Sequence, residues 1–230
     1  MNYNHIFPGT FLARPNRFIA HVEIGGEICV CHVKNTGRCR ELLVPGAKVY
    51  AEESENPLRK TKYDLIAVEK RNSPLGEILI NMDSQAPNKA AQEFLPKLIP
   101  GLTLLRPETV WGNSRFDFYA ETDTLDKWFL EVKGVTLEES GVARFPDAPT
   151  ERGVKHLMEL CRCVQEGYHA GVLFVIQMKG VSRFEPNEAT DPKFSEALRH
   201  AAEQGVKIFA YDCLVTPDSM IVDSPVPINL

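Results

Sequence analysis

The sequence has no apolar stretch long enough to cross a membrane. Its longest apolar run, Ala170–Met178, falls well short of the roughly 18–20 residues that a membrane helix requires. The first residues, MNYNHIFPGTF, contain neither the basic region nor the apolar segment of a secretion signal. We therefore expect a cytoplasmic protein that contacts no membrane.

Signatures of several common site types are also missing. The six cysteines form no CxxC pair, which argues against a zinc site and gives no disulfide framework, so we expect reduced, packed thiols. The sequence contains no phosphate-binding G-x-x-x-x-G-K-[ST] loop, no dinucleotide-binding G-x-G-x-x-G motif and no Ser-His-Asp or Cys-His set. Internal repeats and low-complexity segments are absent as well.

Basic residues are scarce overall but unevenly placed. The net charge of −5 argues against a generally basic coat for nucleic acid. Residues 1–83 nevertheless hold 11 Lys and Arg against 10 Asp and Glu, whereas the remainder holds 15 against 21. Any surface for a polyanion is therefore local, and its predicted cations are Arg14, Arg17, Lys34, Arg38 and Arg40.

The first 83 residues predict a small β-barrel. Short strand-like runs alternate with turn signals, and the runs are Arg17–Ile24, Glu27–Val33, Ala47–Glu53, Lys62–Glu69 and Gly76–Asn81. Five short strands at this spacing are typical of an OB-fold, a barrel often used on single-stranded nucleic acid.

Residues 84–230 predict a second domain of class α/β (α+β), a mixed sheet flanked by helices. The expected helices are Asn88–Ile99, Thr150–Glu166 and Pro192–Gln204. The expected strands are Ser114–Ala120, Lys127–Lys133, Gly171–Met178 and Lys207–Leu214. In the second helix, the predicted apolar stripe consists of Val154, Leu157, Met158, Cys161 and Val164. No flexible linker separates the two halves.

The first two strands of this second half form a hairpin with a notable pair of carboxylates. If the hairpin folds about Thr124, Asp117 lies opposite Glu131 and on the same face as Lys133, because side chains alternate along a strand. The other face then carries the apolar residues Phe116, Phe118, Leu130 and Val132.

Two facing carboxylates repel and weaken a sheet by up to about 1 kcal/mol, so something must offset them. A bound Mg²⁺ or Mn²⁺ is one solution, since these hard ions prefer oxygen ligands and activate water for phosphodiester cleavage. Lys133 would orient that water or stabilise charge on the phosphorus. The alternative is an ordinary solvated face of a hairpin, and a register slip of one residue would separate Asp117 from Glu131.

Further residues are candidates for accessory roles. Arg152 and His156 share a helix face that points either toward Glu131 or into solvent. Glu93 is either a third carboxylate of the site or part of an exposed ion-pair row with neighbouring lysines. Gly134, after Lys133, is expected to end the strand where a backbone can approach a ligand.

Several segments, in order along the chain, resemble the sugar fermentation stimulation protein A family of bacteria and archaea. They are RPNRF at Arg14–Phe18, HVKNTGR at His32–Arg38, ELLVPG at Glu41–Gly46, SRFDF at Ser114–Phe118, EVKGVTLE at Glu131–Glu138, FPDAPTERGVKHLMEL at Phe145–Leu160 and EPNEATDP at Glu185–Pro192. The resemblance implies an N-terminal OB-fold and a domain like the PD-(D/E)xK nucleases. It also implies binding to DNA without sequence preference and a link to sugar (maltose) metabolism genes.

The resemblance also assigns residues. Asp117, Glu131 and Lys133 match the nuclease motif as catalytic residues, with Asp117 and Glu131 as ligands of Mg²⁺ or Mn²⁺. Together with the basic surface, we expect contacts to single- or double-stranded DNA from Arg14, Arg17, Lys34, Arg38, Arg40 and Arg115. Phe116 replaces the usual Pro, and Lys34 replaces the Pro of HVPNTGR. Two functions follow: a Mg²⁺-dependent nuclease, or a non-catalytic DNA-binding regulator of sugar metabolism genes that retains the motif.

Overall fold

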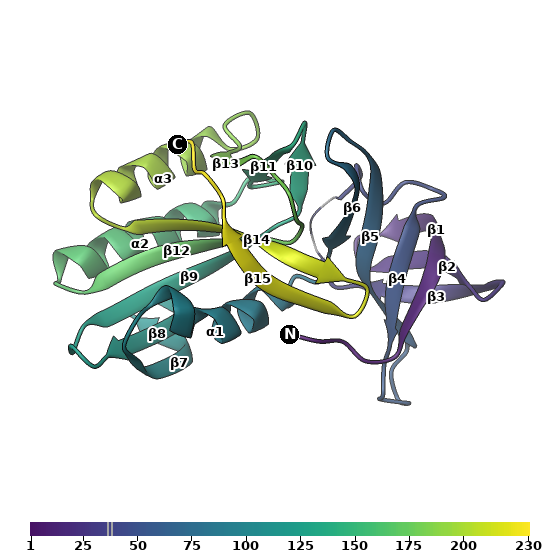
Figure 1. Ribbon diagram of the computed structural model, residues 1–230, viewed down its shortest axis with the longest axis horizontal. Helices are drawn as coiled ribbons and strands as arrows, with labels where there is room; N and C mark the ends of the chain where they lie inside the picture. The colour runs from purple at the N-terminus through teal and green to yellow at the C-terminus, as the bar shows by residue number, and fades with distance from the viewer. Residues whose placement is uncertain (36, 38) are drawn as a thin grey trace.

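The computed structural model describes residues 1–35, 37 and 39–230. A β-barrel formed by the first third of the chain lies beside a mixed sheet with helices on its faces (Figure 1). The expected fold class is confirmed. No helix among the described residues is long and apolar enough to cross a membrane.

The barrel is built from the strands that precede the first helix. They are β1 (Ile6–Asn16), β2 (Ile19–Ile24), β3 (Glu27–Val33), β4 (Lys48–Glu53), β5 (Tyr63–Ser73) and β6 (Gly76–Asn81). Their order is β3-β2-β1-β4-β5-β6, and a parallel pairing of β3 with β5 closes β1–β5 into a barrel. β6 extends the sheet beyond it. The predicted strands all form, but β1 was not predicted.

The reason why β1 escaped prediction lies in its composition. Its sequence contains Pro8, Gly9 and Pro15, which read as strand breakers. Gly9 is required where it stands, because a Cβ there would lie 2.6 Å from Val22 Cγ1 and 2.7 Å from the Glu23 carbonyl oxygen of β2. The glycine thus marks a close approach between two strands of the barrel.

The second sheet has the strand order β15-β14-β12-β9-β8-β7. Its strands are β7 (Leu102–Trp111), β8 (Ser114–Thr122), β9 (Lys127–Val135), β12 (His169–Ile176), β14 (Lys207–Thr216) and β15 (Ser219–Pro225). β12 runs parallel to both β9 and β14, and the other neighbours are antiparallel. A smaller sheet contains β10 (Leu137–Glu139), β11 (Val142–Phe145) and β13 (Arg183–Pro186). β7, β15 and this small sheet were not predicted.

The expected helices are present as α1 (Ala86–Leu98), α2 (Glu151–Gln165) and α3 (Pro192–Glu203). α1 lies on one face of the second sheet, and α2 and α3 lie on the other (Figure 1). Thr150 and Asp191 cap α2 and α3 by accepting hydrogen bonds from first-turn backbone N–H groups. The predicted stripe of α2 is partly wrong. Met158 is exposed, and the buried face is rotated toward His156 and Leu160.

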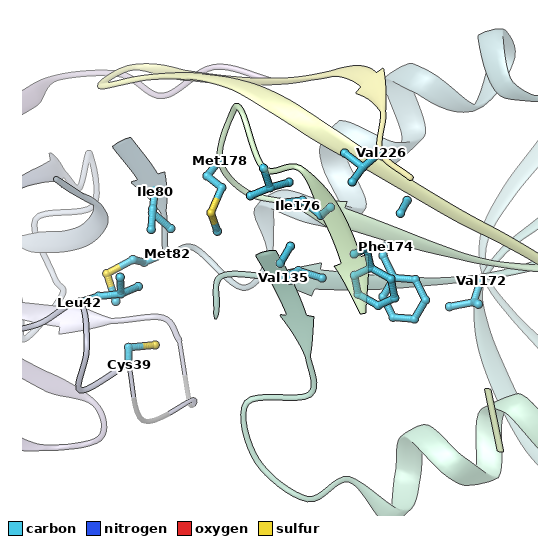
Figure 2. Close-up of a cluster of buried hydrophobic side chains, with 14 of the residues drawn as sticks. Cys39, Leu42, Ile80, Met82, Val135, Val172, Phe174, Ile176, Met178 and Val226 are labelled. Carbon is cyan, nitrogen blue, oxygen red and sulfur yellow. The ribbon is translucent and has the colours of Figure 1, made fainter. Parts of the chain in front are cut away.

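The two halves share one hydrophobic cluster. Leu42, Ile80 and Met82 from the barrel half pack in the same cluster as Ile176 and Met178 from the second sheet (Figure 2). Ion pairing adds to the apolar contact, since Lys70 Nζ of β5 lies 2.6 Å from a buried oxygen of Glu138 in β10. The halves are therefore joined through a common core.

The described cysteines are all free, and Cys29 alone is not fully buried. Burial raises the pKa of the Cys31 thiol to about 12, which keeps it protonated and unreactive at neutral pH. The expectation of packed thiols is confirmed for the described cysteines other than Cys29, and the reduced state stays a prediction.

Candidate metal centre and DNA interface

The hairpin of β8 and β9 has the predicted register. Its pairs are Phe118–Leu130, Tyr119–Phe129, Ala120–Trp128 and Glu121–Lys127. Continued by one residue, this register places Asp117 opposite Glu131. The Lys133 ammonium lies 2.6 Å from Glu131 Oε1, so these two side chains share a face as expected.

At Asp117 the two strands diverge, and a side chain replaces the backbone pairing. The Asp117 carboxylate accepts a 2.7 Å hydrogen bond from the Val132 backbone N–H and a 2.8 Å bond from the amide of Asn88 in α1. Sequence reasoning missed Asn88, because nothing in the helix pattern marks a polar first-turn residue as part of a site.

Gly134 explains how α1 comes near enough to β9 for Asn88 to reach Asp117. A Cβ on Gly134 would lie 2.6 Å from Pro87 Cγ and 2.5 Å from Gln177 Oε1. The bare backbone therefore lets the first turn of α1 pack on β9, next to Asn88. The strand end predicted at Gly134 falls one residue later, at Val135, and Pro87 and Gln177 lie where a Cβ on Gly134 would be.

Glu131 is buried, with 4% of its surface exposed, so it does not belong to a solvated hairpin face. Its Oε1 lies 2.6 Å from Lys133 Nζ and 2.5 Å from His156 Nδ1. Its Oε2 is buried and has no hydrogen-bond partner among the residues that the structure describes. Burial opposes ionisation, but the hydrogen bonds from His156 and Lys133 outweigh it and hold the pKa of Glu131 below its usual range.

Asp117 has the opposite electrostatic character. Burial and the neighbouring charge of Glu131 raise its pKa, and the hydrogen bonds from Val132 and Asn88 only partly compensate. The pair therefore consists of one carboxylate stabilised as an anion and one whose charge is disfavoured. A cation held by both would relieve that cost.

Phe116 does not lie on the predicted face. Phe118, Leu130 and Val132 pack in the cluster that contains α1, as predicted. Phe116 instead packs on the α2 side, with ring centroids 5.6 Å from Phe129 and 6.1 Å from His156. The physical reason is the divergence of β8 from β9 at Asp117, after which the simple alternation of faces no longer holds.

Two of the three accessory candidates lie at the site and one does not. His156 is buried against Glu131, and the exposed Arg152 lies one helical turn earlier with its Nε 3.4 Å from His156 Nε2. The structure thus selects the orientation toward Glu131. Glu93 lies elsewhere: it is 61% exposed and pairs at 2.7 Å with the N-terminal amine of Met1. Neither predicted role of Glu93, site ligand or partner of the lysines, matches this contact.

A cleft of about 360 Å³ on the barrel holds part of the predicted basic surface. It is lined by Arg14, Asn16, Arg17, Gly37, Cys39, Arg40 and Leu43. Arg17 and Arg40 are exposed, and the Arg17 guanidinium lies 4.7 Å from the ring centroid of the exposed Phe18. Arg14 instead braces the cleft, donating to the backbone carbonyls of Arg17, Asn35 and Gly37 at 2.8–3.1 Å.

The remaining cations predicted to contact DNA differ in their surroundings. The Lys34 ammonium lies 3.2 Å from Asp83, 3.3 Å from Asp64 and 3.8 Å from Glu52, so carboxylates offset its charge. Lys34 therefore adds little net positive charge to the predicted DNA surface. Arg115 is 57% exposed, near Glu108 at 3.5 Å. The prediction for Arg38 lies outside the described residues.

The Asp117–Glu131 pair fits an ion that needs few protein ligands. Among the described residues, no group of three or more His, Cys, Asp or Glu side chains is arranged around a common metal position. Mg²⁺ commonly uses only one or two carboxylates and completes its shell with water and substrate phosphate oxygens. Within the pair, the buried Glu131 Oε2 has no hydrogen-bond partner among the described residues. The donor set therefore suits a hard divalent cation of this kind.

Family models and full-length relatives agree on one family for this chain. The family model described as "Sugar fermentation stimulation protein RE domain" matches residues 85–219, and "SfsA N-terminal OB domain" matches residues 12–79. Sugar fermentation stimulation protein homologs of Clostridium beijerinckii and Ruminiclostridium cellulolyticum are each 55% identical, with 100% of both chains covered.

A solved structure, Pyrococcus furiosus SfsA in complex with Ca²⁺, is 30% identical with a TM-score of 0.85. The match covers 100% of this chain and 98% of that one. The resemblance noted in the sequence is thus confirmed by family models, by full-length relatives and by fold. The chain belongs to the sugar fermentation stimulation protein family.

Proposed function

We propose that the protein binds DNA through its barrel and hydrolyses phosphodiester bonds at a divalent-cation site formed by Asp117 and Glu131. The observation that carries this proposal is the buried Glu131 Oε2, an anionic oxygen without a hydrogen-bond partner among the described residues, beside a second carboxylate. Leaving such an atom unpaired costs about 1–3 kcal/mol or more, so a site that keeps it is best explained by a cation.

The side chains divide the work of such a centre. Asp117 is held by Asn88 and by the Val132 N–H, so its carboxylate is fixed in place before any ligand arrives. Glu131 presents its unpaired oxygen on the other side. A Mg²⁺ or Mn²⁺ ion bound between them would supply Lewis acidity to a phosphoryl oxygen and would help a water molecule to ionise.

Lys133 contributes charge at the rim of the pair. Its ammonium lies 2.6 Å from Glu131 Oε1, and the side chain is 16% exposed. An ammonium in this position orients the attacking water or stabilises the negative charge that develops on phosphorus. The solved relative from Pyrococcus furiosus is described in complex with Ca²⁺, which supports oxygen-ligated cation binding in this family.

DNA contact is assigned to the barrel cleft. Arg17 and Arg40 supply exposed positive charge for phosphates, and Phe18, 44% exposed beneath the Arg17 guanidinium, offers a ring on which a base can stack. Stacking of this kind does not depend on base identity, which agrees with the expected lack of sequence preference. The expected cytoplasmic location and the link to sugar metabolism genes stay predictions.

Incubation of plasmid and single-stranded DNA with the protein and Mg²⁺ or Mn²⁺ tests the proposal. We expect cleavage that EDTA abolishes and that Asp117→Asn and Lys133→Met reduce by at least 10²-fold. Asp123→Asn, at the exposed tip of the same hairpin, should cleave normally. Cleavage that survives in Asp117→Asn would contradict the assigned site. Metal-dependent binding without cleavage would favour the alternative, a non-catalytic DNA-binding regulator.

A further inference from the structure

The two carboxylate oxygens of Glu131 have very different surroundings. Oε1 receives both available donors, Lys133 Nζ and His156 Nδ1, while Oε2 receives none from the described residues. A freely rotating carboxylate would share its donors between both oxygens. The side chain is therefore held in a single orientation that leaves one specific oxygen unsatisfied.

The chemistry of Arg152 identifies which nitrogen of His156 holds Glu131. A guanidinium can only donate hydrogen bonds, so the Arg152 Nε–H, 3.4 Å from His156 Nε2, requires Nε2 to be the acceptor. The imidazole proton then resides on Nδ1 and is donated to Glu131 Oε1 at 2.5 Å. The tautomer follows from the hydrogen-bond network.

The imidazole is also fixed mechanically. His156 is 4% exposed, and the edge of the fully buried Phe116 packs on its ring at 6.1 Å and 67°. The first turn of α2 is anchored by Thr150, whose hydroxyl accepts a hydrogen bond from the Gly153 N–H at 3.0 Å. A side chain locked in this way can impose an orientation on its partner.

We propose that His156 is a positioning residue: its Nδ1–H holds Glu131 Oε1 so that Oε2 faces the cation, and Arg152 donates to the other ring nitrogen. This inference rests on the proposed function, because it concerns a cation between Asp117 and Glu131. In this proposal His156 touches neither substrate nor metal. It acts through its hydrogen bond to Glu131 Oε1. His156 is not one of the residues of the nuclease motif.

Two substitutions at His156 separate the hydrogen bond from the volume of the ring. His156→Asn keeps an N–H donor near the position of Nδ1, whereas His156→Leu fills a similar space without a donor. His200→Asn is the matched control, since this histidine lies on a different helix, in the last turn of α3. The measurements are the Mn²⁺ dissociation constant by electron paramagnetic resonance, DNA affinity in EDTA, and the melting temperature.

We expect His156→Leu to weaken Mn²⁺ binding by about 10–100-fold, the usual effect of losing a group that orients a metal ligand. His156→Asn should stay within about threefold of the original chain, and DNA affinity in EDTA should not change in either variant. Unchanged Mn²⁺ binding in folded His156→Leu would overturn the proposal. Equal losses in both variants would also overturn it, because a retained donor would then have no effect.

The tautomer gives a readout that does not depend on metal at all. Nitrogen-15 shifts of the His156 imidazole should show the proton on Nδ1, and they should still show it there in Arg152→Ala, because the Glu131 carboxylate can only accept a hydrogen bond. A proton on Nε2 in the original chain would contradict the assigned hydrogen bonds.

The remaining control separates this inference from the proposed function. If the original chain binds no Mn²⁺, both are wrong. If Asp117→Asn abolishes Mn²⁺ binding while His156→Leu preserves it, the metal site stands and the role of His156 fails.

Discussion

The backbone N–H of Val132 donates a 2.7 Å hydrogen bond to the carboxylate of Asp117, where the ladder between β8 and β9 has just ended. A side chain thus occupies the place of a strand partner, and it carries a charge. Beyond the same divergence, Phe116 packs against His156. Glu131 accepts hydrogen bonds from Lys133 and His156 on Oε1, and its Oε2 has no partner among the described residues. The candidate metal centre arises from this opening in the sheet.

Asp117→Asn should stabilise the metal-free protein. Burial and the charge of Glu131 raise the pKa of Asp117. The folded protein therefore loses stability as the pH rises through that raised pKa, because the carboxyl group must then ionise in an unfavourable place. The neutral amide of Asn avoids this loss. We expect a gain of about 1 kcal/mol at pH 7–8 in EDTA, or about 2–4 °C in melting temperature. The gain should shrink in acid. Mg²⁺ should stabilise only the original chain, by about 2.7 kcal/mol at 100 times its dissociation constant.

Glu131→Gln should have the opposite effect. The pKa of Glu131 is lowered despite burial, because His156 and Lys133 stabilise its charge, so its contribution to stability exists above the unfolded-state pKa and is lost in acid. The amide leaves Lys133 without its partner anion, and we expect a loss of about 1–3 kcal/mol at pH 7 in urea unfolding. If both substitutions changed stability in the same direction, the assigned asymmetry of the pair would be incorrect.

Arg17→Ala and Arg40→Ala should weaken DNA binding through lost phosphate contacts. Each substitution is expected to reduce the slope of log affinity against log salt by about 1, as measured by fluorescence anisotropy. Arg199→Ala serves as control, since this half-buried arginine lies on α3 and pairs with Glu188. A slope that stays constant in the Arg17/Arg40 double variant would place the DNA surface elsewhere.

Lys34→Met should destabilise the fold without changing the salt slope. The Lys34 ammonium lies among Asp64, Asp83 and Glu52, and Asp64 and Asp83 are almost fully buried. Removing one member of such a cluster leaves buried charge uncompensated and costs about 3–5 kcal/mol. Chemical denaturation measures the loss of stability, and the same anisotropy titration measures the salt slope. A reduced slope would show that Lys34 contacts DNA after all.

The shared cluster of Figure 2 predicts cooperative unfolding of the whole chain. Met178→Ala removes a fully buried side chain at the junction and should cost about 2–5 kcal/mol. Calorimetry should show one transition for the original chain and for the variant. Two separate transitions would mean that the barrel and the second sheet unfold as independent units.

The hairpin register was predictable because alternation and a short polar loop leave few ways to pair two strands. Turn signals and apolar periodicity likewise located the helices and most barrel strands. β1 was missed because Pro8 and Gly9 resemble breakers, although the glycine serves a close strand approach. Asn88 could not be found, since its role depends on the packing of Pro87 against Gly134, a contact between distant parts of the chain.

The same limit applies to charge. The sequence places Lys34 among the cations of a predicted DNA surface and does not reveal its carboxylate neighbours, because these come from separate strands and a loop. From the sequence, the helix face with His156 points either toward Glu131 or into solvent. Only the position of α2 over β9 decides between these two orientations. Local patterns thus identified the residues of the site, and tertiary packing determined how they are used.

The most direct test is a crystal soaked with Mn²⁺ and measured for anomalous scattering. We expect a single ion within about 2.0–2.3 Å of Glu131 Oε2 and of one Asp117 oxygen, with His156 still bound to Glu131 Oε1. An Asp117–Glu131 site without anomalous density at saturating Mn²⁺, or an ion bound only at other residues, would contradict it.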